Sequence, residues 1–137
     1  MADYKLAEGL EKKLKTFSMR GTGGHTMILK IDNDAGEVQE VETLTGKSTK
    51  DLAEHLEEEN EPRYLLYIHT LKHSDGRVQY PLALIMHMPQ SSSSAELKVM
   101  YSRPLPMLTS LFRVNKPFTL EDAEDLDDDW LNEKLKI

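Results

Sequence analysis

The stretches RYLLYIHTLK, residues 63–72, and VQYPLALIMHM, residues 78–88, decide the fold of this chain. Both are long, apolar and aromatic, and the residues between them include Asp75-Gly76, a pair typical of tight turns. The two stretches therefore predict a central hairpin whose strands are apolar on both faces, as strands inside a covered sheet are. Pro81 has no amide donor, so we expect a bulge or an unpaired register at that point.

The segments before this hairpin predict two helices and a second pair of strands. Leu6, Leu10 and Leu14 recur at helical spacing with charged residues between them, which indicates an amphipathic helix. In chain order, the predicted elements are a helix at residues 6–16, a glycine-rich turn at 20–24, strands at 26–32 and 37–44, and a short helix that Ser48 or Thr49 caps and that runs to Leu56.

The segments after the hairpin predict a serine-capped helix that two prolines interrupt. The serine tract at 91–94 ends in a helix cap, and helical signal then continues past Pro104 and Pro106. An interior proline costs about 3 kcal/mol in a helix, so we expect a kink or break at 102–106 that places both prolines in the first turn of a second segment. A strand at 114–120 and a helix at 127–135 follow, and the predicted core includes Tyr64, Tyr67, Tyr80, Met100 and Trp130.

Composition and charge limit the possible functions. The 137 residues suit one domain, and the absence of cysteine excludes thiol catalysis and cysteine-ligated zinc. No apolar run approaches the roughly 20 residues of a membrane span. The formal net charge is −7, and only residues 12–20 are locally basic, so we expect neither a membrane nor a nucleic acid as partner.

Isolated residues of chemical interest form no recognisable catalytic or metal-binding pattern. His69, His73 and His87 lack a third ligand at a known spacing, and we interpret them as isolated surface or half-buried histidines. The acidic run at 121–129 lacks the ligand spacing of an EF-hand and is better explained as a solvated helix cap. The glycines at 21–24 lack the Gly-Lys-Ser/Thr ending of a phosphate loop. We therefore predict no catalytic residue, no metal and no cofactor.

Several short motifs occur in a fixed order along the chain. They are KLK-x-F-x-x-R at 13–20, KID at 30–32, EPRY at 61–64, DGRV at 75–78, YPL at 80–82, Met100-Tyr101, EDL at 124–126 and WL-x-EKL at 130–135. Each is weak alone, but the ordered set is specific. It resembles the glia maturation factor family within the actin-depolymerising-factor homology superfamily.

The resemblance implies both a fold and a function. The expected fold is α/β, of the α+β type: a single actin-depolymerising-factor homology domain over residues 1–137, with a mixed central β-sheet packed between helices on both faces. Family members typically bind the actin-related protein 2/3 complex, inhibit branch nucleation and promote debranching. We therefore expect a non-enzymatic regulator of the actin cytoskeleton, monomeric and cytoplasmic, at cortical branched networks.

By the same resemblance, two surfaces would bind partners. The first lies on the exposed face of the long helix and comprises Lys98, Val99, Ser102 and Arg103, with Lys15 and Arg20 nearby. The second joins the turn Asp75-Gly76-Arg77 to the terminal helix at Glu133 and Lys134, and is implicated in debranching. Without the resemblance, we would interpret Lys98 as a solvated helix residue and Arg77 as a turn residue. Lys134 would be a favourable charge near a helix C-terminus.

The sequence departs from the family pattern in the long helix. Where members usually carry a small residue and then a lysine, this chain has RPLP at 103–106, and Leu105 replaces the basic contact. A break there would let Lys98 and Arg103 border the same cleft. The alternative function is cofilin-like binding to actin monomers or filaments, with depolymerising or severing activity, which Lys98 favours. An enzyme is the third hypothesis.

Overall fold

The computed structural model describes residues 4–19, 23–114 and 116–135. The elements, in chain order, are β1 Lys5–Leu6, α1 Leu10–Ser18, β2 His25–Asp32, β3 Glu37–Thr45, α2 Thr49–Glu59, β4 Arg63–Ile68, β5 Leu71–Lys72, β6 Val78–Gln79, β7 Leu82–His87, α3 Ala95–Ser102, α4 Leu105–Phe112, β8 Phe118–Leu120, the 3₁₀ turn η1 Ala123–Asp125, and α5 Asp128–Lys134.

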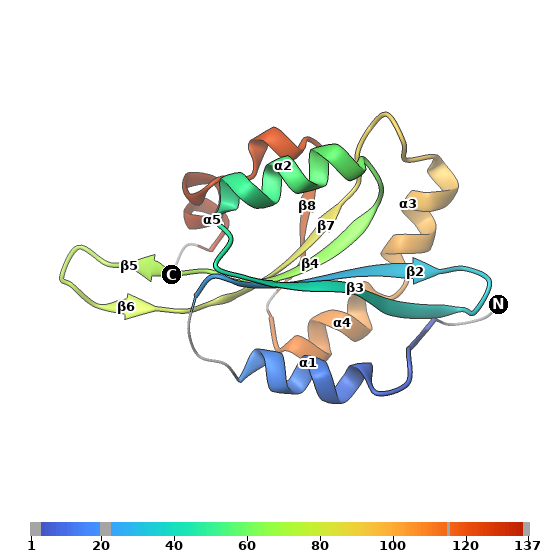
Figure 1. Cartoon of the computed structure of the whole chain (residues 1–137), viewed down its shortest axis with the longest axis horizontal. Coiled ribbons are helices and arrows are strands. Elements are labelled where there is room, and N and C mark those ends of the chain that lie inside the picture. The colour runs from blue at the N-terminus through green and yellow to red at the C-terminus, as the bar shows by residue number, and fades with distance from the viewer. Residues whose placement is uncertain (1–3, 20–22, 115, 136–137) are drawn as a thin grey trace.

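A mixed six-stranded sheet forms the middle layer, in the order β1-β3-β2-β4-β7-β8. The four central strands are antiparallel, whereas β1 joins β3 and β8 joins β7 in parallel. Helices cover both faces: α1 and α4 lie on one side and α2 and α5 on the other (Figure 1). The expected mixed sheet between helices is therefore confirmed.

Alternate residues of the central strands enter two separate cores. Leu66 of β4 packs with Leu14 of α1 and Leu108 of α4, while its neighbour Leu65 packs with Leu52 of α2. Successive side chains of a strand point to opposite faces, and both faces are covered here. This explains why the central strands are apolar without alternation.

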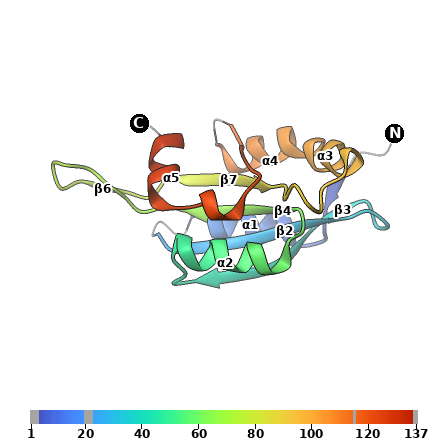
Figure 2. The same cartoon turned by 90° about the horizontal axis from the view of Figure 1, so that it is seen from above.

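The central hairpin is shorter than the sequence predicted. β4 and β7 pair only from Arg63–His87 to Ile68–Leu82, and beyond them β5 and β6 form a separate two-stranded ribbon that projects from one end of the molecule (Figures 1 and 2). The break falls at Pro81, whose carbonyl accepts a hydrogen bond from His69 N at 2.9 Å. The expectation of an interrupted register at this proline is confirmed.

The core prediction was wrong for one aromatic residue. Tyr64 and Tyr67 are buried, but Tyr80 follows the ribbon and is 42% exposed. Met100 and Trp130 are partly buried and pack against the two cores. Tyr80 differs because it lies between β6 and β7, outside the paired part of the central hairpin that the two cores cover.

The first helix begins later than the leucine spacing predicted. Lys5–Leu6 forms β1, whose flanks are held by Lys5 N donating to Gly36 O and Ala7 N donating to Val38 O. Helix α1 then starts at Leu10, after Gly9 in the left-handed region at φ 80°. Leu6 nevertheless packs against the same core as Leu10 and Leu14. The leucine spacing therefore predicted correctly that Leu6 faces the core, but it was wrong in placing Leu6 in a helix.

The predicted helix caps are present. Ser48 and Asp51 form a reciprocal capping box for α2, and Ser94 Oγ accepts from Leu97 N in α3. Asp127 caps α5, and two more aspartates lie in its first turn. Helix α2 continues three residues beyond the predicted Leu56 and ends at Asn60 in the left-handed conformation. The predicted strand at 114–120 is shorter, because β8 begins at Phe118.

The predicted helix break is also present. Helix α3 ends at Ser102, Pro104 is the N-cap of α4, and Pro106 lies in the first turn of α4. Pro104 is itself buried. A proline at a helix start loses no hydrogen bond, because the first amides of a helix have no intrahelical acceptor. In the described part of the chain, no helix is long and apolar enough to cross a membrane.

Candidate functional site

The C-terminal end of α3 is fixed to the sheet through Tyr101. Its ring contacts the Tyr64 ring at a centroid distance of 5.0 Å, and its hydroxyl accepts a hydrogen bond from Ile31 N at 3.1 Å. The Tyr64 hydroxyl in turn donates to the Tyr101 carbonyl oxygen. Burial raises the pKa of Tyr101, so its phenol stays protonated. These contacts join α3 to β2 and β4.

Four predicted binding residues surround one shallow depression on α3, which we call the helix-break surface. The depression has a volume of about 350 Å³ and is lined by Lys98, Val99, Ser102 and Arg103. Val99 is 54% exposed, and Ser102 Oγ donates to the Lys98 carbonyl at 2.7 Å. The surface therefore presents an apolar side chain between two cations.

The two cations of this surface border the same depression. Arg103 lies one residue after α3 ends, where its backbone angles, φ −63° and ψ −46°, are still helical. Five helical residues correspond to about 140° around the axis, and the side chains of Lys98 and Arg103 nevertheless both line the depression. Neither cation forms an ion pair with any of the described residues. Both charges are thus available to a partner.

Of the other two residues assigned to this surface, only Lys15 is among the described residues, and it lies elsewhere. Lys15 is on α1, where its ammonium lies 3.5 Å from the Glu11 carboxylate, and it does not line the depression. Arg20 lies outside the described residues. The structure therefore brings together the α3 residues and leaves Lys15 apart from them.

The second predicted surface is divided between the tip and the base of the ribbon. At the tip, Gly76 has φ 93°, and Arg77 Nε lies 2.7 Å from Asp75 Oδ2. A hydrogen bond from the Arg77 amide lowers the pKa of the Asp75 carboxyl, and the Arg77 side chain adds to this effect. All three tip residues are exposed, and the side-chain contacts of Asp75 and Arg77 are with each other, while the backbone of Gly76 and Arg77 bonds to His73.

Glu133 and Lys134 lie at the ribbon base. They line a cleft of about 690 Å³ that we call the base cleft, whose other walls are Ser18, residues 80–82, Arg113, Val114, Lys116, Phe118 and Leu135. The Lys134 ammonium lies 5.8 Å from the centroid of the Trp130 ring. The ribbon tip points away from α5 in both views (Figures 1 and 2), so the two parts of the predicted surface share one end of the molecule but not one cleft.

Sequence reasoning missed two cations that line the base cleft together with Glu133. Arg113 and Lys116 follow α4 and line the cleft with Lys134. No motif marks them, because their proximity to α5 depends on how α4 and β8 pack.

The histidines are more buried than predicted. His69 and His87 are 2% and 1% exposed, where we expected surface or half-buried positions. His69 Nε2 lies 2.8 Å from Asn132 Oδ1, and burial lowers the pKa of His87 to about 4. His73, beside the ribbon turn, contacts Gln79. Among the described residues, only Glu42, His55 and Glu59 are grouped closely enough to hold a metal ion, and sequence reasoning missed them.

The comparisons with known proteins agree with the fold. The family model for cofilin/tropomyosin-type actin-binding proteins matches residues 3–136. Human glia maturation factor beta is 37% identical over 131 residues, which cover 95% of this chain and 91% of that protein. The Drosophila melanogaster glia maturation factor is 28% identical over 129 residues, 94% of this chain and 92% of that protein.

A solved structure agrees with these relatives. The solution structure of glia maturation factor from Caenorhabditis elegans covers 98% of this chain and 97% of its own, with a TM-score of 0.82 and 29% identity. The sheet, its helical layers and the family model define a cofilin-type actin-binding protein. Within that class, the chain belongs to the glia maturation factor family.

Proposed function

We propose that this protein binds the actin-related protein 2/3 complex, inhibits branch nucleation and promotes filament debranching. The helix-break surface docks on an actin-related subunit of the complex, and the ribbon end acts in debranching. The protein does this by binding, without catalysis, as a cytoplasmic monomer at cortical branched actin networks. Membership of an actin-binding family supports the general function, and the two surfaces support the division of roles.

The arrangement at the helix break carries this proposal. Val99 supplies an exposed apolar contact, and Lys98 and Arg103 border the same depression without an internal ion pair among the described residues. An apolar centre with charged edges suits docking into a cleft, because burial provides affinity while the charges set orientation and association rate.

Arg103 also compensates for the departure from the family pattern. Leu105, at the position of the usual basic contact, is half-buried at the start of α4 and packs against the core on that face of the sheet. A lysine could not take that place without burying its stem and displacing an apolar contact. Arg103 lies two residues earlier, is exposed, and offers the missing charge from the junction itself.

The deciding experiment separates the two surfaces. We expect Lys98→Ala/Arg103→Ala to weaken binding to purified actin-related protein 2/3 complex by roughly tenfold or more, about 1.4 kcal/mol. Glu133→Ala/Lys134→Ala should spare this affinity and lengthen branch lifetimes. Pull-down titration measures the first effect, and single-branch microscopy measures the second.

Matched variants control the test. Lys15→Ala removes a cation of α1 that does not line the depression, and we expect binding within twofold of the unmodified protein. Pro104→Ala keeps both cations but allows a more continuous helix, so it should reduce affinity about threefold. Normal binding and normal branch lifetimes in the Lys98/Arg103 variant would reject the docking surface.

The second candidate is direct, cofilin-like binding to actin. The exposed Lys98 beside Val99 favours it, since the same charged and apolar pair could contact an actin subunit. Filament cosedimentation separates the two functions. Saturable binding to unbranched filaments at about micromolar protein, accompanied by severing, supports cofilin-like action. Retention of the branch complex without filament binding supports the first proposal.

A further inference from the structure

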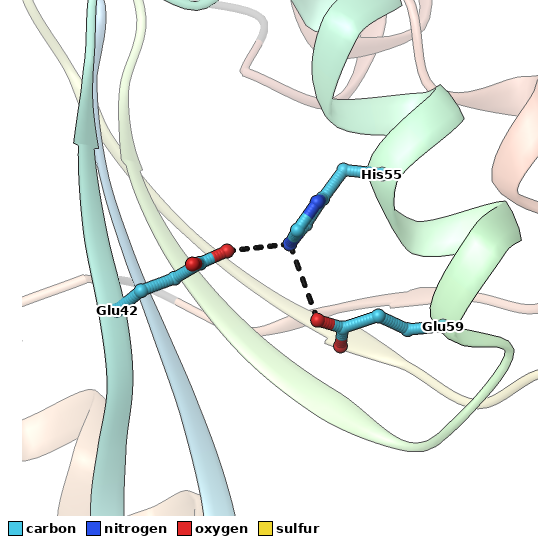
Figure 3. A group of neighbouring side chains, drawn as sticks. All are labelled: Glu42, His55 and Glu59. Carbon is cyan, nitrogen blue, oxygen red and sulfur yellow. Dashed lines mark ion pairs between the residues drawn. The ribbon is translucent and has the colours of Figure 1, made fainter.

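A histidine and two glutamates meet on the α2 side of the sheet. Glu42 comes from β3, and His55 and Glu59 are one turn apart on α2. His55 Nε2 lies 2.5 Å from Glu42 Oε1 and 3.3 Å from Glu59 Oε1. Figure 3 shows the two carboxylates approaching the same ring nitrogen from different elements. The group is thus a convergence of three potential metal ligands.

The contacts at this nitrogen are incompletely satisfied. Glu42 Oε1 and His55 Nε2 are shielded from solvent, and neither forms a hydrogen bond of acceptable geometry with another described residue. A ring nitrogen carries at most one proton, which cannot serve two carboxylates equally. A divalent cation can bind all three groups at once, because each then donates an electron pair to the same centre.

The surroundings favour a cation and allow it to enter. A hollow of about 350 Å³ opens beside Glu42 and His55, and its other charged walls are Lys47, Asp51, Glu54 and Glu58. The hollow thus contains four carboxylates against one lysine, within a chain of net charge −7. Such a field raises the local concentration of cations.

Arg63 holds the Glu59 carboxylate in place, and its positive charge also disfavours a cation nearby. Its Nε lies 3.2 Å from Glu59 Oε2, on the oxygen that does not face His55. At many metal sites, a neighbouring side chain holds a ligating carboxylate by its other oxygen and so fixes its orientation. Arg63 also lies 3.0 Å from Glu61, so its charge is shared between two carboxylates.

We propose that Glu42, His55 and Glu59 form a binding site for a divalent transition-metal ion of the zinc type. Imidazole nitrogen with two carboxylate oxygens suits zinc and its first-row neighbours, whereas calcium and magnesium prefer oxygen alone. Three protein ligands leave a further coordination position for water.

Only a small movement of the three side chains is needed for them to bind zinc. The ligand atoms lie within 4.8 Å of one another, and tetrahedral zinc, with bonds of about 2.0–2.2 Å, needs ligand separations of about 3.3 Å. Glu42 must move away from His55 by under about 1 Å, and its side chain is 35% exposed, which leaves room for that motion. Bound metal would tie β3 to α2, on the face of the sheet opposite α1 and α4.

Zinc titration of the tag-free chain tests the site. Calorimetry with zinc chloride in a non-chelating buffer should show one saturable site per chain, and thermal unfolding should shift upward with zinc. We expect His55→Gln, Glu42→Gln and Glu59→Gln each to weaken binding by tenfold or more. His73→Gln, a histidine on the ribbon, and Glu58→Gln, a carboxylate beside the site, should bind within threefold of the unmodified protein.

Magnetic resonance of the histidine rings in the unmodified protein tests the site even if a variant fails to fold. In the unmodified protein, zinc should shift the His55 ring resonances and leave those of His73 in place. Absence of saturable binding up to about millimolar zinc, unchanged affinity in His55→Gln, or shifts confined to other histidines would each overturn the assignment.

Discussion

The helix-break surface and the ribbon tip are both exposed and charged, but they are built differently. The residues of the first lie within three residues of Tyr101, which contacts β2 and β4 through buried groups. The tip depends on its own turn, on the Asp75–Arg77 pair and on the two paired positions of β5 and β6. The first surface is therefore coupled to the stability of the whole domain, and the second is coupled only to local contacts.

The largest expected effect tests the coupling of the helix-break surface to the core. Tyr101→Ala should lower the free energy of unfolding by about 3–5 kcal/mol, because a buried aromatic ring is lost and Ile31 N loses its acceptor. It should also weaken binding of the branch complex. Urea unfolding measures the stability change.

Two variants serve as controls for this prediction. Tyr101→Phe keeps the ring and should cost about 1–3 kcal/mol for the unsatisfied amide alone. Val78→Ala, on the exposed ribbon, should change stability by about 0.5 kcal/mol or less. Equal losses for Tyr101→Ala and Val78→Ala would contradict the comparison.

A loss of stability of intermediate size is expected when the pH is lowered. Burial lowers the pKa of His87 to about 4, whereas an unfolded histidine titrates near 6.5. Between these values the unfolded chain binds a proton that the folded chain excludes, so stability falls as pH falls. The loss should be about 2 kcal/mol between about pH 7.5 and pH 5.

Because His87 lies near α3 and far from the ribbon, the effect of acid should differ between the helix-break surface and the ribbon tip. His87 ends β7, at the end opposite the ribbon, and the chain then continues into the loop before α3. His87→Gln should flatten the pH dependence in urea unfolding. Amide exchange at about pH 5 should rise in α3 relative to pH 7.5. A pH slope that persists in His87→Gln would assign the effect to other groups.

The smallest effect concerns the ribbon tip. Arg77→Ala removes an exposed ion pair with Asp75, so stability should change by about 0.5 kcal/mol or less. Affinity for the branch complex should stay within threefold, while branch lifetimes lengthen. Thermal unfolding and single-branch microscopy measure the two. A stability loss above about 2 kcal/mol would show that the tip is coupled to the core after all.

The helix-break surface was largely predictable from sequence, and the ribbon end was not. Pro104 and Pro106 break the helix for reasons that lie within the helix itself, so the end of α3 beside Lys98 and Arg103 could be anticipated. The relation of the ribbon to α5 depends instead on Tyr80 leaving the sheet and on how α4 and β8 pack. Sequence spacing contains no information about such distant contacts.

The same distinction holds for the whole chain. Caps such as Ser48 and Ser94, the proline break, and the apolar central strands were determined by the sequence alone, because each depends on neighbours within a few residues or on burial of both faces. Only the tertiary structure decided that Leu6 joins a strand and that Glu42 meets His55. These outcomes depend on pairing across the sheet and on which helix covers which strand, and residues distant in sequence come together only when the chain closes.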